Sequence, residues 1–275
     1  MERFFLELTL IIYIIAWIGS LFYLKTQEKI AYKLYQGVLR VGFIFHIIYL
    51  VLFAKNLWDE PFFTFKEVLS LFSFLLVCVY YYFLLSKLKA YTFGTFLLPL
   101  PIFFLILGIF FLKSAPASPF LPFVKSPWFP LHVLSSLVSH AFLLSGFVAS
   151  IMYLLQEREI KKKHFGYFFQ KLPPLYTLER MAERSLYNGF LFLTIGILSG
   201  ALWSELVFGD YWRWSPKEVI SLALWFIYVG MVHQRILIGW RGKRLAYIFI
   251  LGTSIWFFTF FVVNFYIKGF HSYGQ

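Results

Sequence analysis

The stretch from Phe208 to Glu218 concentrates side chains that suit a large, flat, anionic ligand. Its aromatic rings offer flat faces for stacking, and two cations lie among them. Arg213 and Lys217 can pair with carboxylates, the arginine through two parallel hydrogen bonds. A porphyrin such as haem b combines a flat ring with carboxylates. The aromatic candidates for porphyrin contact are Phe208, Tyr211, Trp212 and Trp214.

Two histidines are candidate iron ligands near this stretch. His132 opens the fifth long apolar run, and His271 follows the eighth. Two neutral imidazoles can take both axial positions of a haem iron. We therefore expect His132 and His271 to form an external haem site, although either residue alone also reads as an ordinary histidine of the membrane interface.

A second pair of histidines lies within apolar runs. Ionisable groups inside a membrane are costly and usually face a cavity or a partner, so His46 and His233 could form an intramembrane haem site. Both also fit hydrogen-bonded core histidines, and His233 could reach the interface. We interpret His140 as a packed histidine or a relay group, and His164 as a solvated one.

The elements that must position these residues are membrane helices. The 275 residues are 60% hydrophobic and only 14% charged. This composition gives more apolar surface than a soluble domain of this length can bury. A membrane-spanning helix needs about 20 apolar residues, and about eight such runs occur. We predict an all-α, polytopic integral membrane protein. The runs cover about 4–24, 36–54, 67–86, 92–112, 131–156, 186–207, 218–238 and 245–267.

The distribution of basic residues predicts the topology. Lysine and arginine gather in alternate connections between the runs, and cytoplasmic loops carry this excess. Both termini and the tryptophan-rich loop, at about 205–218, are therefore expected outside the cytoplasm. The net charge of +12 is explained by topology and anionic membrane lipid, and no nucleic acid is expected as a partner. The clusters span Lys25–Lys33, Lys87–Lys89, Arg158–Arg184 and Arg235–Arg244.

The remaining connections are short, so residues 1–275 are expected to form a single membrane-embedded domain. The 113–130 connection carries five prolines, which exclude a regular helix there. Within the 157–185 connection, Thr177 is a candidate N-cap for a short interfacial helix over 178–184. Cys78 is the single cysteine, which excludes a thiol reductant with a CxxC motif and a c-type cytochrome.

The motif Trp212-Arg-Trp-Ser-Pro-Lys-Glu218 resembles the tryptophan-rich signature of haem-handling membrane proteins. Among these, the chain is most similar to the CcsA (ResC) family of cytochrome c assembly subunits. The similarity is clearest over residues 128–275 and weaker at Phe43-Ile-Phe-His46. Other matching segments are Leu131-His-Val133, Leu172-Pro-Pro-Leu175, Gly200-Ala-Leu-Trp203, Val232-His-Gln-Arg235 and Gly269-Phe-His-Ser-Tyr-Gly274.

The resemblance implies cytochrome c biogenesis at a bacterial inner (plasma) membrane. His46 and His233 would correspond to intramembrane haem ligands, and His132 and His271 to external ones. Haem would cross the membrane and be attached to the CxxCH cysteines of apocytochrome c. A CcsB (ResB)-type membrane subunit and thioredoxin-like thiol reductants would be partners. The chain would then be a subunit of a membrane cytochrome c synthase, or haem lyase.

The chain departs from the family pattern at two positions of the loop. Phe208 stands where tryptophan is usual, and Ser215 where aspartate is usual. His140 also stands where tyrosine is common. These departures leave open a HemX-like, haem-binding regulator of tetrapyrrole synthesis. A transporter unrelated to haem is a third hypothesis, but the sequence shows no inverted repeat of the kind on which many transporters are built.

Overall fold

The computed structural model describes residues 2–59, 65–86, 88, 90–111, 126–163 and 166–266. These residues form helices and contain no β-strand. Seven of the described helical segments are long and apolar enough to cross a membrane. The prediction of an all-α, multi-pass membrane protein is confirmed. The eighth predicted run is helical too, as α11 (Lys243–Tyr266), and its crossing stays a prediction.

Contacts group the chain into two compact units. Unit 1 comprises Met1–Ser114 and Leu155–Thr177, and unit 2 comprises Ala115–Leu154 and Leu178–Gln275. The expectation of one domain over residues 1–275 stays a prediction.

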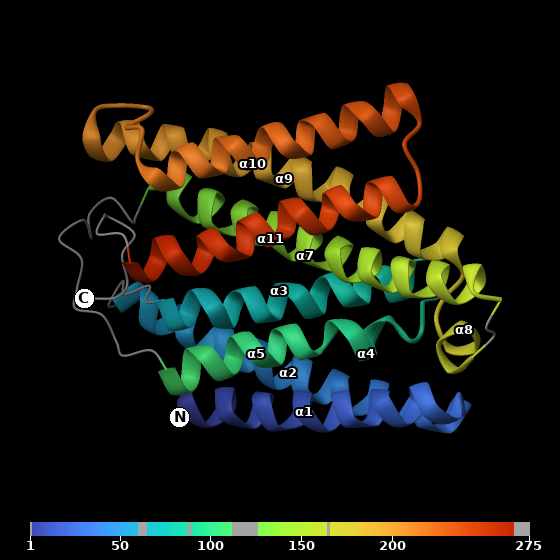
Figure 1. Cartoon of the computed structure of the whole chain (residues 1–275). Helices are drawn as coiled ribbons and strands as arrows, with labels where there is room; N and C mark the ends of the chain where they lie inside the picture. The colour runs from blue at the N-terminus through green and yellow to red at the C-terminus, as the bar shows by residue number, and fades with distance from the viewer. Residues whose placement is uncertain are drawn as a thin grey trace. The chain divides into compact units, whose positions relative to one another are not determined.

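Unit 1 is built on three long helices, α1 (Glu2–Thr26), α2 (Lys29–Asp59) and α3 (Phe65–Leu85). Helices α1 and α2 run side by side in opposite directions (Figure 1). A two-residue connection joins them, and Gln27 in it has a left-handed backbone with φ 59°. The short helix α8 (Tyr167–Lys171) also belongs to this unit.

The fourth predicted run is a broken helix. It consists of α4 (Phe93–Leu97), α5 (Pro99–Ile106) and the π-helical segment η1 (Leu107–Phe111). Pro99 is the first residue of α5 and has no N–H to continue the ladder of α4. The sequence pattern predicted one continuous helix because the run is apolar throughout, and hydropathy does not register the missing donor.

Unit 2 holds most of α7 (Trp128–Lys161) and α9 (Leu175–Phe208), together with α10 (Pro216–His233), the π-helical segment η2 (Gln234–Ile238) and α11. Helices α7 and α9 pack closely, because small residues line their contact. Ser139 donates a hydrogen bond from Oγ to the Gly189 carbonyl at 2.8 Å. A Cβ added to Gly196 would lie only 2.6 Å from Ser136 Oγ.

Helix α9 differs from the sequence expectation. A short helix over 178–184 capped by Thr177 was expected, followed by a separate membrane helix. Instead, one 34-residue helix begins at Leu175 and runs to Phe208. Pro173 and Pro174 precede its first turn, and no proline follows within it, so nothing interrupts the hydrogen-bond ladder.

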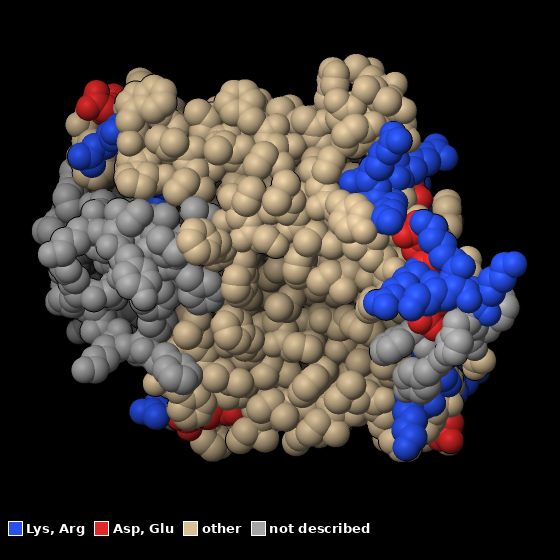
Figure 2. All heavy atoms as spheres, in the orientation of Figure 1, with Lys and Arg blue, Asp and Glu red and all other residues tan. Residues whose placement is uncertain are grey.

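Charged side chains lie near the ends of the helices. Figure 2 shows lysine and arginine in blue and aspartate and glutamate in red, gathered in groups, with uncharged side chains covering the surface between these groups. In unit 2, Arg180 and Arg184 lie in the first three turns of α9, and Arg241, Lys243 and Arg244 lie around the start of α11. An uncharged middle is what a membrane-spanning segment requires.

Candidate haem-binding site

The tryptophan-rich loop joins α9 to α10, and its non-helical part is 209–215. Ser215 is the N-cap of α10, with Pro216 in the first turn. The Ser215 hydroxyl accepts a hydrogen bond from the Glu218 backbone N–H at 3.4 Å. In return, Glu218 Oε2 accepts from the Ser215 N–H at 3.1 Å. This reciprocal capping box satisfies two N–H groups that the helix end would otherwise leave unpaired.

Glu218 also holds the loop further back along the chain. The backbone N–H of Arg213 donates to Glu218 Oε2 at 2.9 Å. Between these two anchored residues, Trp214 has a left-handed backbone with φ 56°, which is uncommon for a residue other than glycine. The carboxylate thus fixes the loop segment that carries the tryptophans.

Ring contacts connect the loop to the first turn of α7. The guanidinium carbon of Arg213 lies 3.9 Å from the centroid of the Phe208 ring. Phe208 meets Trp203 edge to face at 6.4 Å, and Trp203 lies 5.5 Å from Phe129 at the start of α7. The loop and the first turn of α7 lie at the same end of unit 2 (Figure 1).

The two loop tryptophans offer a ligand both a face and a donor. Trp212 and Trp214 meet edge to face, with ring centroids 6.2 Å apart. Trp214 is 72% exposed and Tyr211 59% exposed. The indole N–H of Trp212 is buried and has no hydrogen-bond acceptor among the described residues. A buried donor without a partner is costly, and a ligand carboxylate would satisfy it. Lys217 is the second residue of α10.

His132 lies on the second turn of α7 and is oriented by α9. Its Nδ1 lies 2.8 Å from the Gly196 carbonyl oxygen, which can only accept, so Nδ1 carries the proton. In the neutral ring, Nε2 is then the unprotonated nitrogen, the form that binds iron. Gly200 makes this possible, because a Cβ there would lie 2.6 Å from His132 Nδ1.

A metal-ligating histidine usually donates a hydrogen bond from its other ring N–H to a carbonyl or carboxylate oxygen, as His132 does. His132 and the orphaned Trp212 donor therefore fit an anionic porphyrin. His271, the other expected external ligand, lies outside the described residues, and the pairing of the two stays a prediction. His164 also lies outside them.

His46 is a fully buried histidine in unit 1. Its Nδ1 lies 3.2 Å from the Tyr13 hydroxyl on α1, and its Nε2 lies 3.1 Å from the Ser70 hydroxyl on α3. His46 thus has the contacts of a hydrogen-bonded core histidine, one of the two interpretations that its sequence position allows. Its role as an intramembrane haem ligand stays a prediction.

His233 is the last residue of α10 and is exposed. It belongs to unit 2, whereas His46 belongs to unit 1, and the expected pairing of these two stays a prediction. His140 packs in unit 2 with its ring stacked on Trp256 at 4.7 Å, and its Nδ1 donates to the Ser136 carbonyl. This agrees with the packed histidine expected there.

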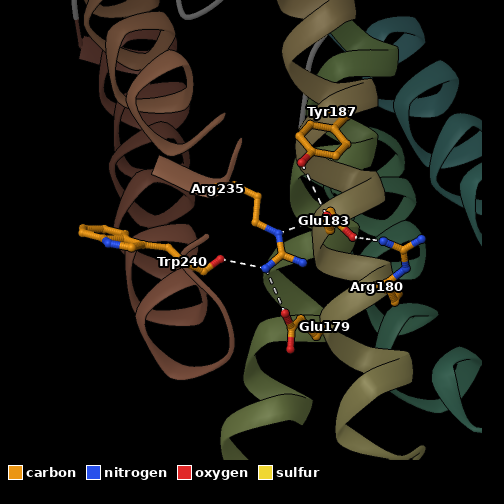
Figure 3. Close-up of polar contacts among 6 residues, drawn as sticks. All are labelled: Glu179, Arg180, Glu183, Tyr187, Arg235 and Trp240. Carbon is orange, nitrogen blue, oxygen red and sulfur yellow. Dashed lines mark hydrogen bonds and ion pairs between the residues drawn. The ribbon is translucent and has the colours of Figure 1, made fainter. Parts of the chain in front are cut away.

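Two residues after His233, a buried arginine forms a network of polar contacts that the sequence alone does not predict (Figure 3). Arg235 donates from Nε to Glu183 Oε1 at 3.0 Å, and its Nη1 lies 3.0 Å from Glu179 Oε1. The same Nη1 donates to the Trp240 carbonyl at 2.8 Å. These contacts tie η2 to the first half of α9.

The network also contains a second arginine and a tyrosine. Arg180 Nη1 lies 2.5 Å from Glu183 Oε2, and Tyr187 donates to Glu183 Oε1 at 3.4 Å. The signal in the sequence was the four-residue spacing of Glu179 and Glu183, which places both carboxylates on one helix face. Their partner, Arg235, is 52 residues after Glu183, so only the fold reveals these ion pairs.

Comparison with known proteins identifies one family. The profile of the family described as cytochrome c assembly protein matches residues 64–271. This range contains the tryptophan-rich loop, His132 and His271, and the Arg235 network.

Individual relatives agree with the profile. The cytochrome c biogenesis protein CcsA of Guillardia theta is 33% identical over 205 residues, 68% of each chain. The protein of the same name from Heterosigma akashiwo (strain NIES-293 / 8280G21-1) is 33% identical over 243 residues, 76% of this chain and 74% of the relative. That of Parasynechococcus marenigrum is 34% identical over 179 residues, 58% of this chain and 59% of the relative.

Proposed function

Because the chain belongs to the cytochrome c assembly protein family and acts in cytochrome c biogenesis, we propose that it binds haem b, moves it across the membrane and presents it outside. There the haem is joined to the CxxCH cysteines of apocytochrome c. The observation that carries this proposal is His132, whose Nδ1–H is held by the Gly196 carbonyl. Its Nε2 is thereby directed to iron.

In this proposal the external ligands are His132 and His271, and the intramembrane ligands are His46 and His233. Trp212 donates its buried N–H to a carboxylate of haem, while Trp214 and Tyr211 offer exposed rings to the porphyrin. Arg213, whose guanidinium lies over the Phe208 ring, and Lys217 pair with the haem carboxylates, and Phe208 adds an aromatic contact to the porphyrin. Haem is the substrate, and the chain contributes ligands, stacking faces and donors.

The working unit is a membrane complex. We propose a CcsB (ResB)-type subunit as its partner, and together they form a cytochrome c synthase in the bacterial plasma membrane. Thioether formation needs free cysteines on apocytochrome c, so thioredoxin-like reductants supply the thiols. Among the described residues Cys78 is the one cysteine, a free one within α3, so this chain has no pair of thiols for that task.

The loop departures do not favour the HemX-like regulator. Phe208 keeps ring contacts with Trp203 and Arg213, as a stacking residue does. Ser215 retains the N-cap position, which aspartate also fills well. Both residues can therefore take the roles, aromatic contact and helix N-cap, that tryptophan and aspartate would have in the assembly proteins.

The proposal is tested by the absorption spectrum of the protein purified with its CcsB-type partner. We expect low-spin haem with two histidine ligands. His132→Ala should lower the haem content, and so should Gly200→Ala, because its new methyl group displaces the His132 ring. Gly230→Ala is the matched control, since nothing lies within 4 Å of its added Cβ, and it should retain haem. Unchanged haem content in the His132→Ala, His271→Ala double variant would contradict the external site.

A further inference from the structure

Pro99 deprives one backbone carbonyl of the broken fourth run of its helical partner. In an α-helix the N–H of residue 99 would donate to the Thr95 carbonyl, and proline has no N–H to donate. The hydrogen bonds on either side are made: the Leu98 N–H donates to the Gly94 carbonyl at 2.9 Å, and the Ile102 N–H donates to the Leu98 carbonyl at 3.3 Å. This run is long and apolar enough to cross a membrane, where an unpaired carbonyl is costly.

The side chain of Trp17 supplies the missing donor from another helix. Its Nε1–H, on α1, donates to the Thr95 carbonyl at 3.1 Å. Two further hydrogen bonds reinforce this contact, because Thr95 Oγ1 donates to the Ser20 carbonyl at 3.1 Å and Ser20 Oγ donates to the Trp17 carbonyl at 2.7 Å. Thr95 and Ser20 are both buried. The end of α4 that meets Pro99 is therefore attached to α1.

The segments on either side of this attachment are held by other helices. Ser73 on α3 donates from Oγ to the Pro101 carbonyl, in the first turn of α5, at 3.0 Å. Tyr35 on α2 donates from its hydroxyl to the Tyr91 carbonyl, just before α4, at 2.9 Å. The bond from Trp17 thus lies between two attachments that do not depend on it.

We propose that Pro99 is a hinge within the fourth run and that the Trp17 indole is its latch. With the latch closed, the Thr95 carbonyl is paired and the end of α4 is fixed on α1. With the latch open, this end moves about Pro99, while the bonds from α2 and α3 keep the start of α4 and the start of α5 in place. Proline is a usual origin of a kink in a helix, and here a side chain from a neighbouring helix controls it.

Trp17→Phe tests the latch, because it keeps an aromatic ring and removes the donor. Hydrogen exchange of the full chain in nanodiscs is measured by mass spectrometry. Backbone amides of α4 should exchange about 5-fold faster, as expected for the net loss of one neutral hydrogen bond, while those of α1 and α5 keep their rates. Unchanged exchange in α4, or an equal increase in α4 and α5, would overturn the proposal.

Trp225→Phe is the matched control for this variant. The Trp225 indole N–H donates to Thr194 Oγ1 at 3.0 Å within unit 2, so the same chemical change is made where no proline is involved. It should leave the exchange of α4 unchanged. Faster exchange of α4 in the control as well would show a general loosening of the fold rather than the release of a latch.

The hinge itself is tested by Pro99→Ala, which gives residue 99 an N–H for the Thr95 carbonyl. In this background Trp17→Phe should lower the midpoint of thermal unfolding by about half as much as in the unmodified chain, or less, because the two changes share one partner. Trp225→Phe should lower it equally in both backgrounds. Equal effects of Trp17→Phe in the two backgrounds would contradict the replacement of the missing donor by the indole. If Pro99→Ala does not fold, Pro99→Gly supplies the same N–H, and the exchange of α4 decides independently of both.

Discussion

The hydroxyl of Ser215 explains why the tryptophan-rich loop tolerates a residue other than aspartate. Its side chain and that of Glu218 cap the start of α10 reciprocally. An aspartate would accept the same hydrogen bond with a full charge. The N-cap position requires a short side chain whose oxygen accepts a hydrogen bond from the Glu218 N–H. Serine and aspartate both meet this requirement.

Ser215→Ala should therefore destabilise the protein, whereas Ser215→Asp should not. Loss of an N-cap costs about 1 kcal/mol, and the freed loop should become more sensitive to protease between 209 and 215. The measurements are thermal unfolding in nanodiscs and limited proteolysis. If Ser215→Asp were cleaved as fast as Ser215→Ala, the capping explanation would be wrong.

The link between η2 and α9 is an interaction between elements rather than a property of one residue. Arg235 is 9% exposed, within a segment classed as apolar enough to cross a membrane. It makes ion pairs with Glu179 and Glu183. A π-helical turn changes the register of the residues that follow it. The ion pairs of Arg235 therefore link this segment to the first half of α9.

Removing this arginine should unfold unit 2 more easily. Arg235→Met removes the ion pairs to the half-buried Glu179 and to the buried Glu183, which keeps Arg180 as a partner. Breaking a fully buried ion pair costs about 3–5 kcal/mol, which is an upper bound here. Arg3→Met is the matched control, because Arg3 pairs with Glu7 at 2.8 Å with its side chain 77% exposed, and such helix pairs contribute about 0.2–0.5 kcal/mol. Equal shifts in the unfolding midpoint for the two variants would contradict a buried role for Arg235.

Particular elements show how far the sequence could predict the structure. Apolar runs located the membrane helices, since hydropathy depends on composition alone. The break at Pro99 and the continuity of α9 through 178–186 depend on which backbone donors find partners, which hydropathy does not report. At the candidate site, the tryptophan-rich loop was predictable from local clustering. The contacts of His132 with Gly196 and of Arg235 with Glu183 join residues 64 and 52 positions apart, so they required the fold.

At the scale of the whole molecule, the distribution of charge still predicts an orientation that remains to be tested. Within unit 2, Tyr211 lies in the tryptophan-rich loop and Arg244 lies in the first turn of α11, at the opposite end of α10. The positive-inside rule places Arg244 in the cytoplasm. It follows that Tyr211 faces outward.

Cysteine labelling in intact cells can check this orientation. Cys78 is the single cysteine, so Cys78→Ser gives a background without thiols. Tyr211→Cys should react with a membrane-impermeant maleimide before lysis, and Arg244→Cys only after it. Both positions are exposed, which makes the pair a matched comparison. Labelling of Arg244→Cys in intact cells would reverse the proposed topology.

The backbone of Trp214 has a consequence for how selection shaped this loop. A left-handed conformation costs a residue other than glycine about 1–2 kcal/mol, and glycine would adopt it without strain. The indole does not recover this energy by burial within its own chain, because it is 72% exposed. A sequence optimised only for folding would place glycine here. The proposed contact of the Trp214 ring with haem would account for a tryptophan at this position.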